Sequence, residues 1–207
     1  MIVEQPAGNF EDKYNSKNPI SARLVANFLR TFETMAERSG VREVYEVGCG
    51  EGELIARLAQ TGFTVRGSDV AREAIAEALV RHPELEGRIE VAPLQQLSAA
   101  RDSAPLVVCC EVLEHIDDPE EALDVLVELA KPYLLASVPR EPLWRALNMS
   151  RLKYVENFGN TPGHVNHWSS RSFVAFLERR FEVIAVSRPL PWTMVLAKSR
   201  SAPQASE

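Results

Sequence analysis

Short hydrophobic runs of strand length alternate with segments of helical periodicity along most of this chain, and this alternation constrains the fold more than any other feature. Such a pattern is typical of β-α-β units, in which successive strands lie parallel in one sheet and helices cover its faces. The alternating strand-like runs are 41–48, 63–69, 88–93, 104–110 and 133–139. The sequence therefore predicts an α/β fold with a mainly parallel sheet.

Both ends of the chain add elements to this sheet. Apolar side chains at helical spacing over 18–37 predict an extra helix, which forms an N-terminal cap over 1–40. Near the other end, the runs 181–189 and 193–199 are close enough in sequence to form an antiparallel hairpin. We therefore expect a seven-stranded sheet whose last two strands are antiparallel.

Length and composition favour a single domain. The chain has 207 residues, of which 45% are hydrophobic and 25% charged, as in ordinary globular domains. We expect one domain over 1–200 and a disordered tail over 201–207. The net charge of −6 disfavours an electrostatic grip on nucleic acid, because phosphate binding depends mainly on Lys and Arg.

Several features predict a cytoplasmic protein. No apolar stretch reaches the roughly 18 to 20 residues that a membrane helix needs, and the first residues lack the basic and then apolar build of a secretory signal. The three cysteines are Cys49, Cys109 and Cys110. An odd number with two adjacent residues suits reduced thiols better than a disulfide framework.

Residues 139–168 interrupt the alternation and are too long for a plain connection between a strand and a helix. They contain Trp144, Tyr154, Phe158 and Trp168 among proline, glycine and asparagine. We expect this excursion to lie as a lid over the strand ends. Trp144, Tyr154 and Phe158 are expected to form a small core of the lid, and a cage for the acceptor is the alternative.

A glycine-rich segment, "YEVGCGEGEL", follows the first strand and opens a helix. Gly48, Gly50 and Gly52 allow the backbone to turn tightly against a ligand that faces the helix N-H groups. A dinucleotide fingerprint would have a glycine or small residue at position 53, where this chain has Glu53. The segment therefore predicts a nucleotide-like ligand other than NAD.

An acidic residue stands at the tip of each of the first two strands. Glu46 lies two residues before the first glycine, and Asp69 ends the second strand-like run. The Glu46 carboxylate can accept hydrogen bonds from a network around a ligand amine, and the Asp69 carboxylate can accept them from ribose hydroxyls. The two acids flank the glycines and complete a predicted binding cradle.

Over residues 41–138 these motifs resemble, in order, those of the class I S-adenosylmethionine (SAM)-dependent methyltransferases. The resemblance implies a Rossmann-like fold, a glycine loop that holds the methionyl part of SAM, and an Asp69 that holds its ribose. Many relatives place an Asp near the adenine, but this chain reads "VAPLQQL", so Leu94 or Gln95 takes that place. The implied SAM-binding residues are Tyr14, Glu46, Gly48, Cys49, Gly50, Gly52, Asp69, Val70, Leu94 and Cys110.

The segment "CCEVLEH" places charged side chains directly after the buried fourth strand. Ionised groups there are costly to bury unless they are paired, hydrogen-bonded or bound to metal. Glu111 and Glu114 are three residues apart in a turn and His115 follows at once, so two oxygens and an imidazole can hold Mg²⁺ or Mn²⁺. The excursion offers His164 or His167 as a further ligand.

This set resembles the E-x-x-E-H segment and distant histidine with which small-RNA 3′-terminal 2′-O-methyltransferases hold a metal. Ubiquinone-pathway O-methyltransferases share a similar run. The resemblance implies the metal ligands Glu111, Glu114, His115 and His164. Metal-free methyltransferases also carry a Leu-Glu-His segment, so His115, His164 or His167 as a general base, or a purely structural turn, are alternatives.

The sequence thus predicts a SAM-dependent methyltransferase that performs metal-assisted O-methylation of a small hydroxylated molecule. One alternative is 2′-O-methylation of RNA ribose, and another is a cofactor-binding partner protein without catalysis. The acceptor, the methylated atom, the metal and the oligomeric state stay open at this point.

Overall fold

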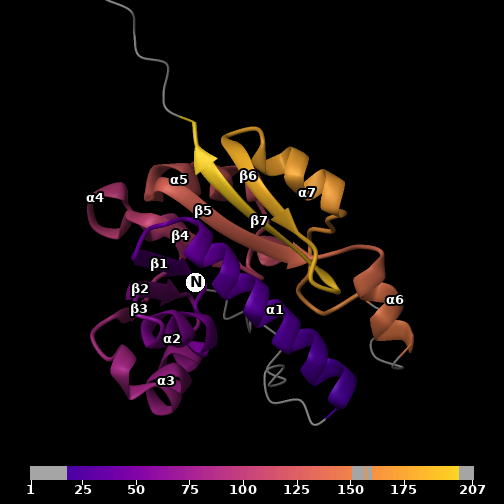
Figure 1. The fold of residues 1–207 in the computed structure, drawn as a ribbon, viewed down its shortest axis with the longest axis horizontal. Coiled ribbons are helices and arrows are strands. Elements are labelled where there is room, and N and C mark those ends of the chain that lie inside the picture. Colours follow the sequence, from indigo (N-terminus) through magenta and orange to yellow (C-terminus); the bar gives the residue numbers. More distant parts are fainter. Residues whose placement is uncertain (1–17, 151–156, 158–159, 201–207) are drawn as a thin grey trace, which may run out of the picture.

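The strand-like runs form one sheet of seven strands in the order β3-β2-β1-β4-β5-β7-β6 (Figure 1). The computed structural model describes residues 18–150, 157 and 160–200. The strands are β1 Glu43–Val47, β2 Thr64–Asp69, β3 Ile89–Val91, β4 Ala104–Cys110, β5 Ala130–Pro139, β6 Phe181–Ser187 and β7 Trp192–Ser199. Strands β1 to β5 pair in parallel, and β7 is antiparallel to both β5 and β6. This confirms the predicted seven-stranded, mainly parallel sheet with a closing hairpin.

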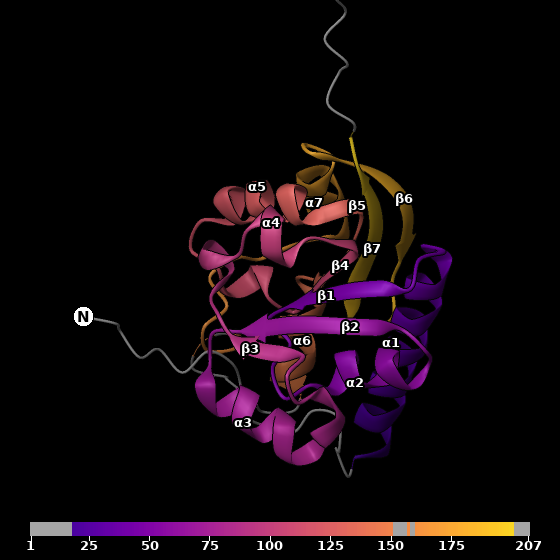
Figure 2. The same ribbon diagram turned by 90° about the vertical axis from the view of Figure 1, so that its left-hand side faces the viewer.

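Helices cover both faces of the sheet. The helices are α1 Pro19–Arg38, α2 Glu53–Gln60, α3 Arg72–Arg81, α4 Ala99–Asp102, α5 Pro119–Leu129, α6 Leu143–Ser150 and α7 Ser170–Leu177, with 3₁₀ turns η1 Pro83–Leu85, η2 Leu94–Gln96 and η3 Leu113–His115. Figure 2 shows α4, α5 and α7 on one side of the sheet and α1, α2 and α3 on the other. Each side has its own buried cluster, represented by Phe32 and Ile55 on the α1 side and by Leu126 and Phe173 on the other.

Capping residues explain where α1 and α5 begin. The Asn18 side chain accepts hydrogen bonds from the N-H groups of Ile20 and Ser21, and Pro19 occupies the first position of α1. Asp118 caps α5 in the same way. None of the described helices combines the length and hydrophobicity that a membrane-spanning helix needs.

The helix before β5 ends earlier than its sequence pattern. Helical spacing of apolar residues continues over 118–131, but α5 ends at Leu129 and β5 begins at Ala130. Pro132 explains the difference, because proline disfavours the helical conformation of the residue before it. The pairing of β4 with β5 shifts register beside Pro132, a place where a strand tolerates proline.

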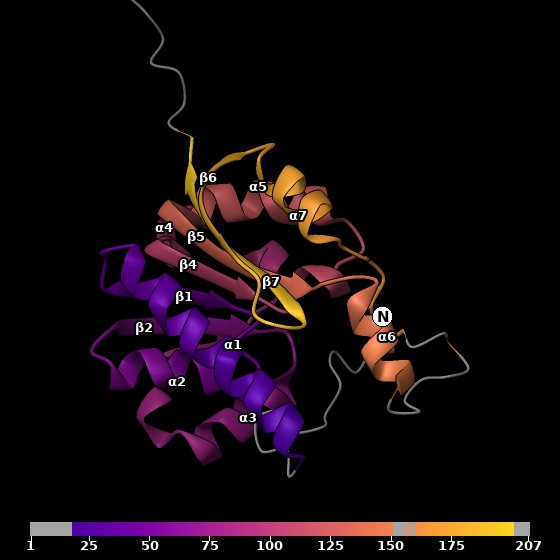
Figure 3. The same cartoon turned by 45° about the vertical axis from the view of Figure 1, so that its right-hand side comes forward.

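The excursion leaves the sheet at the carboxyl end of β5 and returns beside its own start. The Glu141 N-H donates to the carbonyl of Trp168 at 2.8 Å, and Arg140 and Trp168 form an isolated parallel bridge. Figure 3 shows α6 beyond the tip of β5. An insertion after the fifth strand is therefore present at the expected place, and its action as a lid remains a prediction. Tyr154 and Phe158 lie outside the described residues.

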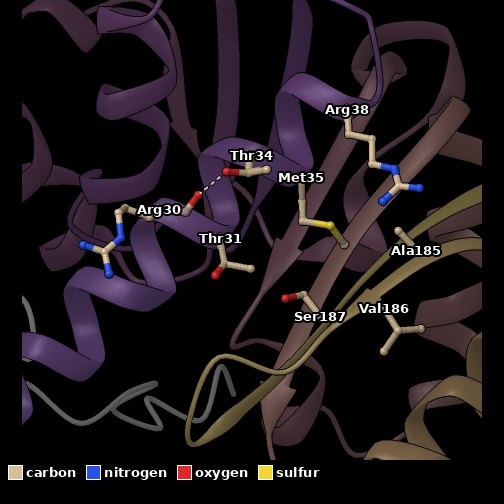
Figure 4. Close-up of a pocket in the computed structure, with 8 residues that line it drawn as sticks. All are labelled: Arg30, Thr31, Thr34, Met35, Arg38, Ala185, Val186 and Ser187. Carbon is tan, nitrogen blue, oxygen red and sulfur yellow. Dashed lines mark hydrogen bonds between the residues drawn. The ribbon is translucent and has the colours of Figure 1, made fainter.

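A groove of about 470 Å³ lies between α1 and β6 (Figure 4). It includes none of the residues that the sequence predicts for the site. Its lining residues are Arg30, Thr31, Thr34, Met35, Arg38, Ala185, Val186 and Ser187.

Candidate active site

The glycine loop, residues 48–52, has a backbone that only glycine adopts without strain. Gly48 and Gly50 have φ angles of 71° and 51°. A Cβ on Gly48 would lie 2.4 Å from Cγ2 of Val112, so this glycine permits close packing of the loop against the segment after β4. A Cβ on Gly50 would meet no atom of the described residues within 4 Å. The loop thus leaves open space in front of Gly50, as a ligand cradle requires.

Asp69 fixes this loop to the end of β2. Its Oδ2 accepts a hydrogen bond from the Gly50 N-H and its Oδ1 accepts one from the Ala71 N-H, both at 2.8 Å. Each carboxylate oxygen has a further lone pair, so the half-buried group can also accept from a ligand hydroxyl. The sequence predicts Asp69 as a ribose ligand, and the structure adds its role in holding the loop.

The other predicted SAM-binding residues fall into two groups. Glu46, Cys49, Leu94 and Cys110 are at least 90% buried around the glycine loop, η2 and the end of β4, whereas Val70 is exposed. Burial raises the pKa of the Cys49 and Cys110 thiols, so both stay protonated near neutral pH. All three cysteines are free thiols. Tyr14 lies outside the described residues.

Each carboxylate oxygen of Glu111 accepts a hydrogen bond from a side chain of the sheet. The Ser137 hydroxyl donates to Oε1 at 3.0 Å, and the Trp192 indole N-H donates to Oε2 at 2.6 Å. Its φ of 62° is the only positive value at a non-glycine residue among the described positions. These contacts tie the tips of β4, β5 and β7 together, and the structure does not bring Glu111 into the group of ligand atoms described next.

Glu114, His115 and His164 form a compact group of possible metal ligands. One ligand atom from each lies within 4.8 Å of the others. Glu114 and His164 are 2% and 9% exposed, so the group is largely withdrawn from solvent. We call these three residues the ligand group. The structure thus brings together three of the four predicted metal ligands.

A hydrogen bond to the excursion fixes the proton on the His115 ring. Nδ1 of His115 lies 3.0 Å from the carbonyl oxygen of Gly163. Because a carbonyl oxygen only accepts, we assign the N-H to Nδ1, which leaves the lone pair on Nε2. Metal-binding histidines typically have their second ring nitrogen bonded in this way.

An aromatic wall supports His164. The Trp144 ring is stacked on the His164 ring with centroids 6.2 Å apart, and the Trp192 ring lies 5.7 Å from Trp144. The Trp144 indole donates to the Thr161 hydroxyl at 2.9 Å. Trp144 also packs against the main core on the α1 side. It therefore supports the ligand group, a role that the prediction of a separate core in the excursion did not include.

His167 lies apart from the ligand group. It is exposed, and its Nε2 lies 2.9 Å from the amide oxygen of Asn160. His167 is therefore not a member of the group that Glu114 forms with the other two predicted general bases, His115 and His164.

A family model described as a methyltransferase domain matches residues 15–186. The chain belongs to this methyltransferase family. The match spans the glycine loop, the ligand group and the excursion, so it includes every predicted site residue except Tyr14. Membership agrees with the resemblance to class I SAM-dependent methyltransferases.

Relatives with curated names match about half of this methyltransferase. The ubiquinone biosynthesis O-methyltransferases of Salmonella arizonae and Klebsiella pneumoniae are 38% and 37% identical to it over 106 residues. The match covers 47% of this chain and 43% of each relative. The matched region is therefore less than half the length of these relatives.

Solved structures confirm the class I methyltransferase fold. Magnesium protoporphyrin IX methyltransferase from Synechocystis PCC 6803, with SAH bound, has a TM-score of 0.67 at 21% identity, covering 91% of each chain. The N-methyltransferase NodS from Bradyrhizobium japonicum, in complex with SAH, has a TM-score of 0.67 at 18% identity, covering 94% of each chain. The small RNA methyltransferase HEN1 has a TM-score of 0.65 at 15% identity, covering 89% of this chain and 27% of HEN1.

Proposed function

We propose that this methyltransferase transfers the methyl group of SAM to a hydroxyl oxygen of a small molecule, with a divalent metal held by the ligand group. The observation that carries the proposal is the contact between the glycine loop and the segment that carries Glu114 and His115. Gly48 packs so closely on Val112 that no side chain fits between them. The methyl donor SAM and the hydroxyl that accepts the methyl group would therefore bind side by side. We call the glycine loop with Asp69 the donor side of the site, and the ligand group with Glu111 the acceptor side.

The donor side aligns SAM rather than activating it. A sulfonium methyl group is already activated, so the protein mainly orients it for in-line displacement and excludes water. The open backbone at Gly50 suits the methionyl part, and Asp69 can accept from the ribose hydroxyls while it holds the loop. We assign the adenine to the surroundings of Leu94.

The donor atoms of the ligand group suit a transition metal. With Glu111 bonded to Ser137 and Trp192, the set consists of one carboxylate oxygen and two imidazole nitrogens. Imidazole favours Mn²⁺, Fe²⁺ or Zn²⁺ over Mg²⁺, which prefers oxygen ligands and water. Because one ligand atom of each residue lies within 4.8 Å of the others, Glu114, His115 and His164 are the residues that would hold such an ion. When bound, such an ion would favour ionisation of the acceptor hydroxyl.

His115 offers an alternative without metal. Its Nε2 lone pair could accept the proton of the acceptor hydroxyl, because Nδ1 carries the ring proton. The two schemes differ in their response to a chelator. Metal-assisted transfer stops when EDTA removes the ion, whereas transfer with His115 as the base continues.

The small acceptor is supported by the names of the curated O-methyltransferase relatives and by the charge of −6. RNA ribose is a second candidate because the ligand group matches part of the metal motif of the small-RNA enzymes. A non-catalytic, cofactor-binding role is the third possibility.

Methyl transfer from radiolabelled SAM tests these alternatives. The EDTA-treated protein would be assayed with phenols, aliphatic alcohols and short RNA, with Mn²⁺, Mg²⁺ or no metal. We expect transfer to a small hydroxylated compound only with a transition metal, and loss of transfer in Glu114→Gln. The exposed Glu128→Gln in α5 is the matched control. Transfer to RNA alone, or no transfer with any acceptor, would replace the proposal with the second or third candidate.

A further inference from the structure

Asn166 bonds to the turn that carries Glu114 and His115. Its amide nitrogen donates to the carbonyl oxygens of Leu113 at 3.1 Å and Ile116 at 2.6 Å. The Leu113 carbonyl also accepts from the Ile116 N-H within the turn at 3.4 Å, so the Asn166 side chain adds a partner from outside the turn. A primary amide has two N-H donors, and Asn166 therefore uses both on this turn.

The backbone around Asn166 binds the carbonyl group of Glu114, which lies between Leu113 and Ile116 in the turn. The N-H groups of Val165 and Asn166 both donate to the carbonyl oxygen of Glu114, at 2.9 and 3.1 Å. The Gly163 carbonyl meanwhile accepts from His115. Residues 163–166 thus bind the turn at several points and also carry His164, the third member of the ligand group.

We propose that Asn166 is a positioning residue that sets the affinity of the ligand group for its metal by clasping residues 163–166 onto η3. This inference rests on the proposed function, because it assumes that the group binds metal. His115 and Gly163 are 48 positions apart in the sequence. Proximity along the chain therefore does not keep the segment of His164 next to Glu114 and His115. Without the clasp, metal binding must also order the excursion, and this cost lowers the affinity.

The substitution Asn166→Asp tests the clasp with almost no change in shape. A carboxylate cannot donate and would face two carbonyl oxygens. We expect the dissociation constant for Mn²⁺, measured by calorimetry on the EDTA-treated protein, to rise by about tenfold or more. Affinity for SAH should change by less than about twofold, because Asn166 bonds the turn and not the glycine loop. Asn27→Asp in α1 adds the same charge elsewhere and should change neither constant.

Hydrogen exchange without metal gives an independent measurement. Peptides that contain residues 163–167 should exchange faster in Asn166→Asp, because the bonds of Val165 and Asn166 to Glu114 open more often. If Asn166→Asp does not fold, as judged by loss of SAH binding, Asn166→Ala takes its place in both measurements.

The outcomes separate the clasp from the proposed function. Unchanged Mn²⁺ affinity in a folded variant would overturn the clasp and leave the metal site standing. If the wild-type protein binds no Mn²⁺, the metal part of the proposed function fails, and the role of Asn166 in metal affinity fails with it. Exchange then tests only whether Asn166 holds residues 163–166 on η3, and unchanged exchange in Asn166→Asp would overturn that as well.

Discussion

The donor side and the acceptor side of this site are built in different ways. On the donor side, Asp69 and Gly50 are 19 positions apart and belong to one β-α-β unit. On the acceptor side, two of the bonds that shape the site join residues much farther apart, 48 positions for His115 with Gly163 and 81 positions for Glu111 with Trp192. The donor side thus depends on the local geometry of one unit, whereas the acceptor side depends on docking of the excursion and the C-terminal hairpin. The difference predicts that substitutions on one side leave ligand binding on the other side largely intact.

The largest effect is expected from Gly48→Ala on the donor side. A Cβ there meets Val112 at 2.4 Å and is held at a left-handed φ, so overpacking and backbone strain add. We expect a loss of about 3 kcal/mol in the free energy of unfolding and about 100-fold weaker SAH binding. Gly62→Ala, also at positive φ but with open space, is the control and should cost only about 1 kcal/mol. Equal losses in urea unfolding would contradict the steric account.

Asp69→Asn removes one acceptor from the donor side without changing its shape. An amide has a single acceptor oxygen, so either the Gly50 or the Ala71 N-H loses its partner. We predict SAH binding weaker by about 30-fold in calorimetry, and Mn²⁺ binding unchanged. The exposed Asp124→Asn serves as the control. A matching loss of Mn²⁺ affinity would break the separation of the two sides.

Glu114→Gln and Glu111→Gln compare two acids on the acceptor side. Loss of a charged ligand in Glu114→Gln should weaken Mn²⁺ binding by about tenfold or more. Glu111→Gln should keep Mn²⁺ affinity within about threefold, because the amide can still accept from Trp192 and donate to Ser137. If both substitutions weaken Mn²⁺ binding equally, Glu111 is a metal ligand after all.

The smallest effect concerns the buried thiols, one of which lies in the glycine loop and two in β4. Burial raises the pKa of Cys49, Cys109 and Cys110 above that of an unfolded thiol, which is about 8.5. The unfolded chain therefore releases protons first, and stability should fall as pH rises above about 8.5. Cys49→Ala should reduce the loss between pH 7 and pH 9 by about 1 kcal/mol in urea unfolding. An unchanged pH dependence would show that the Cys49 thiol ionises equally in both states.

The fold and the donor side could be predicted because their signals are local. The alternation of runs predicts the sheet, Gly48 and Gly50 stand in the loop after the first strand, and Asp69 ends the second strand. The bond between Asp69 and the Gly50 N-H could not be predicted, because it depends on how the loop turns back over β2.

The acceptor side could be predicted only in part. The spacing of Glu111 and Glu114 suggests that both point the same way, but the positive φ of Glu111 and the indole of Trp192 direct its carboxylate elsewhere. Asn166 has no periodic signal and was missed. The only hint in the sequence is an amide two residues after His164, and its partners become visible only when η3 and the excursion meet.

The most direct test is a crystal structure with SAH and Mn²⁺, recorded at a wavelength where manganese scatters anomalously. The account predicts SAH along the glycine loop and an anomalous peak in contact with Glu114, His115 and His164, with Glu111 still bonded to Trp192. No peak at saturating Mn²⁺, together with methyl transfer that EDTA does not affect, would contradict it.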